Sequence, residues 1–458
     1  MATITKRGDT YRIRVSVGYS TDGRQIMQSM TWKPAPGMTK RQEEKELNRQ
    51  AALFEERVRS GQYICSNIKF ADFVERWFKD YAEKQLRPKT VLGYKYMKDR
   101  TNAAIGHIRL DRLQPHHLLE FYNNLAEEGV REDVKYRCVS DLRKMIKQSG
   151  QSMEDFAKAA GVSPRTLRAA ASGENVRRSS AQAISDALKT KLSALFEPAD
   201  TKKTLSGSTI QHYHRYISSV LSTAVQWQII ASNPCERVKP PKAERKEAKY
   251  LDEKQSLELL QCLDEEPIMY KTLFMLILYT GMRRGEACGL TWDDIDLKNE
   301  IIDINKTSIY TPERGVFDDD TKNSSSRRVV RVPAPMIEQL RKYKRHQAQQ
   351  RLKLGDKWEN SDKLFTTWNG RAIHPDTVSA WLREFIKRHN LPEVTVHGLR
   401  HTNATLLIYN GTNIKTVSSR LGHADVSTTG NIYTHAIKTA DEMAAETLAD
   451  IFSRKKNA

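Results

Sequence analysis

Apolar and polar residues alternate near the start of the chain. From Thr10 to Val17 the odd-numbered positions are tyrosine, isoleucine or valine, and the even-numbered positions are polar. A period of two places the apolar side chains on one face of an extended chain, so the pattern predicts a half-buried strand. The residues expected on its buried face are Tyr11, Ile13, Val15 and Val17.

The following segments complete a small sheet and add a helix. Asp22-Gly23 is a hairpin-turn signal, and residues 24–32 supply a returning strand. Thr39 and Gln42 form a capping box that opens a helix. We therefore expect a three-stranded sheet backed by a helix over residues 1–62.

The polar face of this sheet carries Arg12 and Arg14. Two arginines on one strand face can enter a DNA groove and contact bases or phosphates. A solvated strand face explains the same two residues equally well. Both interpretations stay open from the sequence.

A pattern with helical spacing begins near Phe70, and its aromatic residues favour a buried core over base stacking. Further helices are expected after Pro88, Pro115 and Leu205. These segments predict a helical domain made of residues 68–131 and 204–241. Its aromatic residues are Phe73, Trp77, Phe78 and Tyr81, and the prolines expected to mark a linker are Pro234, Pro240 and Pro241.

The segment 132–203 carries a complete local pattern of its own and interrupts the helical domain. Ser152 caps the helix MEDFAKAA, a turn follows at Gly161, and Pro164 occupies the first position of RTLRAAA. This pattern resembles the helix-turn-helix of phage-repressor-like proteins. A helical bundle that contacts protein is the alternative. The residues expected on the recognition helix are Arg165, Thr166 and Arg168.

Composition narrows the class of partner. The chain has 458 residues, with 75 Lys and Arg against 56 Asp and Glu, so its net charge is +19. Such a balance points to a polyanion. The five cysteines are widely spaced and odd in number, which argues against a disulfide framework or a zinc site. The longest apolar stretch, Leu273 to Tyr279, is too short for a bilayer span, so we expect a cytoplasmic protein with no membrane partner.

Four motifs follow one another in the C-terminal part of the chain. They are TGMRRGEACGLTWDDIDL, TKNSSSRRVVRVP, HGLRHTNATLL and LGHADVSTTGNIYTH. Each motif alone is ordinary, but their order and separation resemble the signature boxes of the tyrosine recombinase (phage integrase) family, including the integrases of phages and conjugative transposons. The residues that match the family's catalytic positions are Arg283, Lys322, His397, Arg400, His423 and Tyr433.

The resemblance implies a multidomain α+β fold. Residues 1–62 would bind arm-type DNA sites, the helical domain would bind the core site, and residues 246–458 would form a mixed α/β, mainly helical catalytic domain. The inserted helix-turn-helix bundle lies outside the usual pattern. The expected function is site-specific DNA recombination that integrates and excises a mobile genetic element.

The candidate residues suit this chemistry on physical grounds. Two guanidiniums, Arg283 and Arg400, can neutralise a phosphate as charge develops on it, and His397 stands one helical turn before Arg400. Tyr433 would attack the phosphate with help from a neighbouring imidazole such as His397. By resemblance, Lys322 protonates the leaving 5′ oxygen from a hairpin tip. His423 would donate a hydrogen bond to the phosphate.

We expect no metal ion and no other cofactor in this reaction, since the motifs include no paired carboxylates or metal-ligand cluster. Glu286 and Asp294 are expected to hold Arg283 and the strand ends, and His401 and His435 to be structural or peripheral. The alternatives are a non-catalytic DNA-binding regulator and a type IB topoisomerase.

The family also implies partners. They are double-stranded DNA attachment sites, a homotetramer assembled on two of those sites, and an excisionase-type accessory protein. After Tyr433 the chain has an amphipathic pattern with Met443, Leu448 and Ile451 as its apolar residues. We expect this C-terminal tail to pack on its own domain or on a neighbouring protomer.

Overall fold

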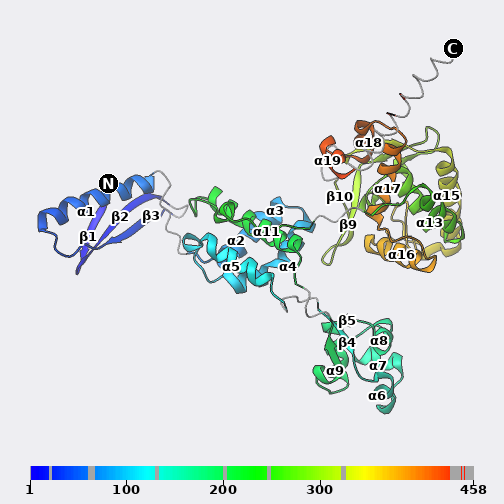
Figure 1. Ribbon diagram of the computed structural model, residues 1–458, viewed down its shortest axis with the longest axis horizontal. Coiled ribbons are helices and arrows are strands. Elements are labelled where there is room, and N and C mark those ends of the chain that lie inside the picture. Colours follow the sequence, from blue (N-terminus) through cyan, green and yellow to red (C-terminus); the bar gives the residue numbers. More distant parts are fainter. Residues whose placement is uncertain are drawn as a thin grey trace. The chain divides into compact units, whose positions relative to one another are not determined.

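The computed structural model describes residues 2–19, 23–59, 68–128, 134–199, 204–244, 249–320 and 326–433, with two isolated positions at 445 and 448. Contacts divide the chain into two units, 1–245 and 246–458. The first unit contains three separate hydrophobic cores. They belong to an N-terminal module (2–59), a central helical module (68–128 with 204–244) and an insert (134–199) (Figure 1). The second is the C-terminal unit.

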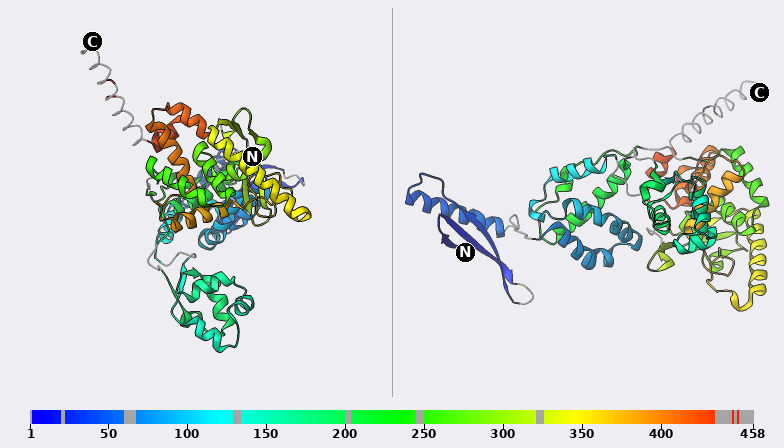
Figure 2. Two further views of the ribbon diagram at one scale, coloured as in Figure 1. Left: turned by 90° about the vertical axis from the view of Figure 1, so that its right-hand side faces the viewer. Right: turned by 90° about the horizontal axis from the view of Figure 1, so that it is seen from below.

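The N-terminal module is an antiparallel sheet with a helix along one face (Figure 2). The predicted capping box is present, because the Thr39 amide donates to Gln42 Oε1 at 3.0 Å and the Gln42 amide donates to Thr39 Oγ1 at 3.4 Å. Ile13 and Val15 are buried against Phe54 of the helix. The elements are β1 (Thr3–Arg7), β2 (Thr10–Tyr19), β3 (Gln25–Trp32) and α1 (Lys40–Arg59).

One residue of the predicted buried face is exposed. Val17 is 51% exposed. Strand β2 has a bulge at this point, because Ser16 pairs with Met27 while Gly18 pairs with Ile26. The extra residue ends the strict alternation that the sequence suggested. Half of the predicted hairpin turn, Asp22, lies outside the described residues.

The central helical module is built on the predicted aromatic residues. Trp77 is fully buried, and its indole nitrogen donates to Thr223 Oγ1 at 2.9 Å. Pro88 and Pro115 each open a helix, as expected. The elements are α2 (Phe70–Trp77), a π turn (Phe78–Ala82), α3 (Glu83–Gln85), α4 (Pro88–Ile105), a 3-10 turn (Leu110–Arg112), α5 (Pro115–Leu125) and α11 (Gly207–Gln226).

The predicted linker begins later than the sequence suggested. Pro234 starts a 3-10 turn (Pro234–Arg237), and Cys235 and Val238 pack into the core of the central helical module. These apolar side chains find buried partners, so the segment is part of the module. The division between the two units falls after Arg245.

The insert contains the predicted helices and a small sheet that the sequence did not predict. Ser152 and Ser163 cap their helices, and their hydroxyls accept from the amides of Asp155 and Thr166. Strands at the two ends of the insert pair with each other, and the Ala199 amide donates to Lys135 O at 2.7 Å. The two ends of the insert therefore lie next to each other in space. Its elements are β4 (Lys135–Cys138), α6 (Leu142–Gln148), α7 (Met153–Ala159), α8 (Pro164–Ala171), β5 (Val176–Arg177), α9 (Arg178–Ala187), α10 (Leu192–Leu195) and β6 (Phe196–Pro198).

The C-terminal unit is mainly helical, with two small sheets ordered β11-β8-β7 and β10-β9. The apolar helix α13 (Ile268–Thr280) packs in its centre against α15 (Ala334–Leu354) and α17 (Val396–Tyr409). The other helices are α12 (Glu253–Cys262), α14 (Arg284–Gly289), α16 (Pro375–Arg388), α18 (Ile414–Leu421) and α19 (Val426–Ile432). The strands are β7 (Ile295–Asp296), β8 (Ile301–Ile304), β9 (Lys306–Thr311), β10 (Gly315–Asp320) and β11 (Arg328–Arg331).

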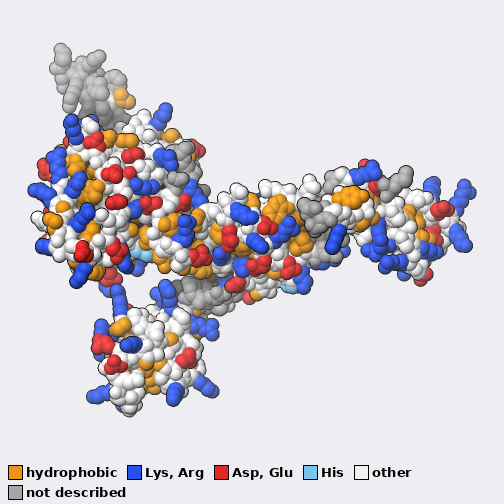
Figure 3. Space-filling view, turned by 180° about the vertical axis from the view of Figure 1, so that it is seen from behind, with side chains coloured by type: hydrophobic (Ala, Val, Ile, Leu, Met, Phe, Trp, Pro, Cys, Tyr) orange, Lys and Arg blue, Asp and Glu red, His pale blue; other side chains and the backbone are white. Residues whose placement is uncertain are grey.

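The surface fits the basic composition. In Figure 3, Lys and Arg side chains project from every part of the chain, with Asp and Glu between them on the C-terminal unit. No helix in the described ranges combines the length and apolar composition needed to cross a bilayer. The cysteines within these ranges are unpaired thiols.

Candidate active site

A tight turn after the central helix positions the first candidate arginine. Helix α13 ends at Gly281, which adopts a left-handed conformation with φ of 65°. A Cβ atom at Gly281 would lie 2.6 Å from Leu421 Cδ2 and 2.8 Å from Asn403 Oδ1, so a side chain does not fit. The turn places Arg283 at the N-cap of α14.

A buried carboxylate holds this arginine. Glu286 is 3% exposed and accepts from the Arg283 amide at 2.9 Å and from Arg283 Nη1 at 2.7 Å. It also accepts from Arg328 Nη2 at 2.9 Å. Burial by itself would raise the pKa of Glu286, but the charges and hydrogen bonds of Arg328 and Arg283 outweigh it and lower that pKa. Glu286 therefore stays ionised and fixes both guanidiniums, as the sequence suggested for Arg283.

The second candidate arginine lies on α17 and is almost fully buried. Arg400 is 1% exposed, and its Nη1 donates to Gly281 O at 2.8 Å. Its Nη2 has no hydrogen-bond partner within the described part of the chain. Burial and the neighbouring Arg283 lower the pKa of Arg400 to about 9, which leaves it charged at neutral pH. A buried charged donor without a partner is costly unless a ligand satisfies it.

The predicted nucleophile Tyr433 follows α19 and is 4% exposed. Its hydroxyl lies 2.8 Å from Nδ1 of His401, which is 8% exposed. Burial raises the pKa of Tyr433 to about 12, and the charge of Arg400 opposes this rise. Burial, followed by His397 and Arg400, lowers the pKa of His401 to about 4. At neutral pH this pair is therefore a phenol beside a neutral imidazole.

The other two candidate histidines flank this pair. His397 stands one turn before His401 on α17 and is exposed, with its ring centroid 4.6 Å from that of His401 at an interplanar angle of 83°. Partial burial, Arg400 and Arg283 lower the pKa of His397. His423 follows α18, and its Nδ1 lies 2.8 Å from Thr429 Oγ1. Burial, followed by Arg400 and Arg283, lowers the pKa of His423 to about 4.

These contacts join elements that are far apart in the sequence. Arg283 Nη2 donates to Gly422 O at 3.4 Å, directly before His423. Arg400 connects to the turn after α13 through Gly281. Five of the six predicted catalytic residues therefore belong to one cluster, in which hydrogen bonds and electrostatic interactions connect them.

The sixth, Lys322, lies outside the described residues. Its expected place at a hairpin tip therefore stays a prediction. Strands β9 and β10 pair from Gly315 opposite Thr311 to Asp320 opposite Lys306, so residues 312–314 form the turn between them. Lys322 follows Asp320, the last residue of β10, by two positions in the sequence.

Two charged residues around the cluster, Asp294 and Arg328, have structural contacts. Asp294 accepts from the Thr291 amide at 2.7 Å and from Asn305 Nδ2 at 2.9 Å, which ties the segments next to β7 and β9 together. Arg328 donates through Nε to Arg420 O at 2.6 Å. Sequence reasoning assigned His401 a structural or peripheral place and did not single out Arg328. The i, i+4 spacing of His397 and His401 was the available signal for the first.

The DNA-binding candidates lie in other parts of the chain. Arg12 and Arg14 are half-buried on the sheet face opposite Ile13, as predicted, and Arg12 Nη2 donates to Ser29 Oγ at 3.4 Å. All three candidates of the insert lie on α8. Arg165 and Arg168 are exposed, and Thr166 is half-buried.

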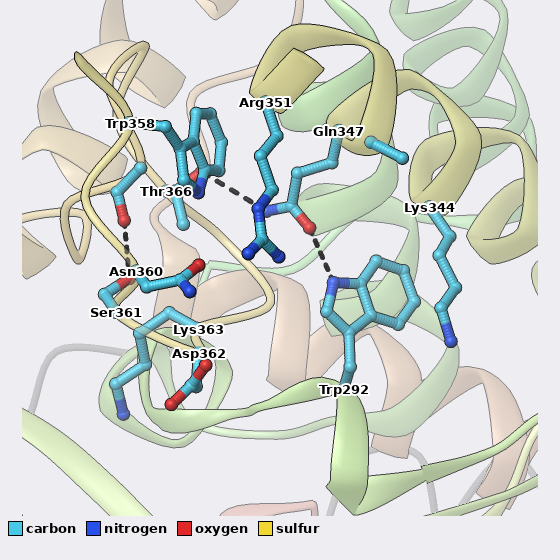
Figure 4. Close-up of a pocket in the computed structure, with 12 residues that line it drawn as sticks. Trp292, Lys344, Gln347, Arg351, Trp358, Asn360, Ser361, Asp362, Lys363 and Thr366 are labelled. Atoms are coloured by element: carbon cyan, nitrogen blue, oxygen red, sulfur yellow. Dashed lines mark hydrogen bonds between the residues drawn. The ribbon is translucent and has the colours of Figure 1, made fainter. Parts of the chain in front are cut away.

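A separate pocket of about 200 Å³ opens between α15 and the loop that follows it (Figure 4). Trp292 Nε1 donates to Gln347 Oε1 at 2.6 Å, and Gln347 Nε2 donates to Thr366 Oγ1 at 3.3 Å. Lys344 lies over the Trp292 ring. None of the predicted catalytic residues lines this pocket, so we do not place the active site there.

The cluster of Tyr433 and the arginines has the features of a phosphoryl-transfer site that forms a link to tyrosine. Two guanidiniums can bind the non-bridging oxygens of a phosphodiester, and the phenol supplies a nucleophile beside a possible base. This defines the class of protein as a phosphoryl-transfer enzyme with a tyrosine in its active site.

Family models match most of the chain. Residues 249–439 match the phage integrase family, and residues 69–126 match the N-terminal SAM-like domain of phage integrases. Residues 141–200 match the Cro/C1-type helix-turn-helix DNA-binding domain.

Relatives agree with these matches. The XerC-like tyrosine recombinase of Caldanaerobacter subterraneus is 31% identical over 264 residues, which cover 54% of this chain and 67% of the relative. The ICEBs1 integrase of Bacillus subtilis is 27% identical over 247 residues, which cover 54% of this chain and 67% of the relative. A structure of the Tn1549 transposon integrase in complex with transposon right end DNA aligns with a TM-score of 0.57 at 17% identity, over 83% of this chain and 100% of that chain. That structure shares the fold.

The chain belongs to the phage integrase family of tyrosine recombinases. It is a site-specific DNA breaking and rejoining enzyme, so the predicted class of fold and the predicted type of activity are both confirmed.

Proposed function

We propose that this recombinase integrates and excises a mobile genetic element by cutting and rejoining attachment sites through a 3′-phosphotyrosine at Tyr433. The observation that carries the proposal is the buried Arg400, whose Nη2 has no hydrogen-bond partner among the described residues and whose charge acts on the Tyr433 hydroxyl. A phosphodiester oxygen would satisfy this donor. The similarity to the ICEBs1 integrase supports a mobile element as the substrate.

Each candidate residue has a role in this scheme. Arg283 and Arg400 bind the non-bridging oxygens and stabilise the charge of the pentacoordinate state. Thr429 engages Nδ1 of His423, which leaves the other ring nitrogen for the phosphate. Tyr433 attacks in line, and Lys322 protonates the leaving 5′ oxygen. The guanidiniums supply the positive charge, so the proposed step uses no metal ion.

The phosphotyrosine retains the energy of the broken phosphodiester, so rejoining to another 5′ hydroxyl requires no nucleotide triphosphate. Strand exchange then depends on which DNA sites are brought together. We propose a homotetramer on two attachment sites, and an accessory protein that favours excision. An enzyme with this substrate would act in the bacterial cytoplasm.

The modules divide the DNA contacts. The N-terminal module, which lies within the predicted domain 1–62, binds arm-type sites through the sheet face that carries Arg12 and Arg14. The central helical module (68–131 and 204–241) and the catalytic domain (246–458) hold the core site. A half-buried arginine on a sheet face keeps its charge near the surface, where it can reach a DNA groove.

The insert (132–203) contacts DNA through α8. Among its candidates, Arg168 is engaged by Glu154 at 2.6 Å, and Thr166 contacts the hydroxyl of Ser163 at 2.8 Å. Arg165 is exposed and has no hydrogen bond or ion pair within the described residues. We therefore assign Arg165 the main contact, since its guanidinium is available for a base or phosphate.

Replacing Arg165 by alanine is expected to weaken binding to the insert's preferred duplex by about tenfold or more, because one arginine contact contributes roughly 1–3 kcal/mol. Preferred duplexes are selected from a random pool with the full-length chain, and affinities are measured by titration. Lys189→Asn is the matched control, since Lys189 is an exposed cation at a turn outside α8 with φ of 52°. Equal affinities for Arg165→Ala and wild type would favour the protein-contact alternative.

The proposed chemistry is tested with a nicked suicide substrate that carries the attachment site, in buffer containing EDTA. Wild type is expected to form a covalent protein-DNA band on a denaturing gel, and Tyr433→Phe is expected to bind the same duplex without forming it. Adduct formation by Tyr433→Phe would disprove the assigned nucleophile. Binding without an adduct for both proteins would favour the regulator alternative, and relaxation of supercoiled DNA that lacks the site would favour the topoisomerase.

A further inference from the structure

The proton acceptor for the nucleophile can be inferred from the contacts of Tyr433. The tyrosine hydroxyl and Nδ1 of His401 are 2.8 Å apart, and both residues are buried. A neutral imidazole that carries its proton on Nε2 accepts the hydroxyl hydrogen at Nδ1. This is the arrangement from which a proton can move without a bridging water.

His397, which the sequence favoured as the helper of Tyr433, is placed differently. It is exposed, and its ring stands nearly perpendicular to the His401 ring, with a centroid distance of 4.6 Å. Among the described contacts, the hydrogen-bond partner of the Tyr433 hydroxyl is Nδ1 of His401. His397 therefore remains available to the phosphate.

We propose that His401 is the general base for Tyr433, an inference that rests on the proposed function. The Tyr433 hydroxyl proton moves to Nδ1 of His401, the phenolic oxygen bonds to phosphorus, and the bond from phosphorus to the 5′ oxygen breaks. That oxygen takes a proton from the general acid, assigned above to Lys322. On rejoining, the imidazolium of His401 returns its proton to the phenolic oxygen.

The surroundings of His401 couple this step to DNA binding. His397 and Arg400 face it from α17, Tyr433 from the end of α19, and His423 from the segment after α18. The positive charge of Arg400 and burial keep the pKa of His401 low in the free protein. A bound phosphodiester adds negative charge beside Arg283 and Arg400, which raises the affinity of His401 for a proton. The base becomes effective when the substrate is present.

The test measures single-turnover cleavage of the suicide substrate by full-length wild type and His401→Asn between pH 7 and pH 9. Asparagine places an amide oxygen near the position of Nδ1, so it can accept the hydrogen bond but cannot take the proton. Cleavage by His401→Asn is expected to be about 10²–10⁴-fold slower at pH 7 and to rise about tenfold per pH unit, because it depends on the fraction of Tyr433 that is already ionised. The wild-type rate is expected to change much less.

A second measurement separates loss of the base from a folding defect in His401→Asn, because a more acidic phenol compensates only for a missing base. Fluorotyrosine at position 433 has a more acidic phenol, so it is expected to restore much of the rate lost in His401→Asn while changing the wild-type rate little. His346→Asn on α15 is the matched control and should keep the wild-type pH profile. The proposal would be overturned if the His401→Asn rate is lowered equally at every pH and is not restored by fluorotyrosine. It would also be overturned if His401→Asn cleaves as fast as wild type. Absence of an adduct with wild type would instead count against the proposed function itself.

Discussion

Replacing Arg400 by lysine is expected to slow strand cleavage by about 100-fold or more, with a small effect on DNA affinity. Lysine keeps a positive charge but has a single ammonium group. It cannot both donate to Gly281 O, as Nη1 of Arg400 does, and present a second planar donor to the phosphate. The contact that is lost strengthens as charge develops in the transition state, so the rate falls more than the affinity.

Single-turnover adduct formation on the suicide substrate measures this effect, with DNA affinity measured separately. Arg383→Lys provides the control, because Arg383 is an exposed arginine of the same unit on α16. A cleavage rate for Arg400→Lys within about threefold of wild type would mean that Nη2 does not meet the phosphate, since loss of a transition-state donor costs far more.

Replacing Glu286 by glutamine is expected to lower the free energy of unfolding of the C-terminal unit by about 3 kcal/mol, since breaking a buried ion pair leaves a buried charge without its partner. The charge concerned is mainly that of Arg328, whose side chain is 6% exposed, whereas that of Arg283 is 39% exposed. The amide group of glutamine would also direct hydrogens at one of the two guanidiniums. Cleavage should slow as well, because Arg283 loses its orientation.

The lowered pKa of Glu286 determines how its contribution to stability changes with pH. The pKa of Glu286 is lowered in the folded protein from its ordinary value of 4.5. Its contribution to stability is therefore complete above that value and is lost as the pH falls through the lower folded value. Glu286→Gln should remove this part of the acid sensitivity.

Urea unfolding followed by tryptophan fluorescence at pH 7 and at pH 4 measures both effects of the Glu286 variant. The matched control is Glu338→Gln, at an exposed position of α15. If Glu286→Gln unfolds at the same urea concentration as wild type, the carboxylate does not hold the two arginines in the way described.

Local sequence signals predicted much of the fold because capping and periodicity depend on nearby residues. The Thr39 capping box, the proline at the start of α8 and the buried Trp77 all follow from short-range rules. The bulge at Val17 and the pairing of the insert's two end strands depend on partners far along the chain or on one extra residue in a strand. A pattern of alternation does not contain that information.

The candidate site could be predicted from the sequence for a different reason. The family motifs named five residues that the structure joins into one cluster, and side-chain chemistry gave each a role. The spacing of His397, Arg400 and His401 on one helix could not say which imidazole meets Tyr433, because that depends on how α19 returns to α17. The sequence also did not reveal the contact between Glu286 and Arg328, because these residues are 42 positions apart.

The central claim is that Tyr433 becomes covalently joined to the 3′ end of the cleaved strand. Its most direct test is mass spectrometry of the trapped adduct after digestion with nuclease and trypsin. Cleavage after Arg420 and Lys438 gives a peptide, residues 421–438, that contains a single tyrosine. We predict that this peptide carries a phosphonucleotide on Tyr433, formed in the presence of EDTA. A nucleotide found on another residue, with residues 421–438 unmodified, would contradict the account.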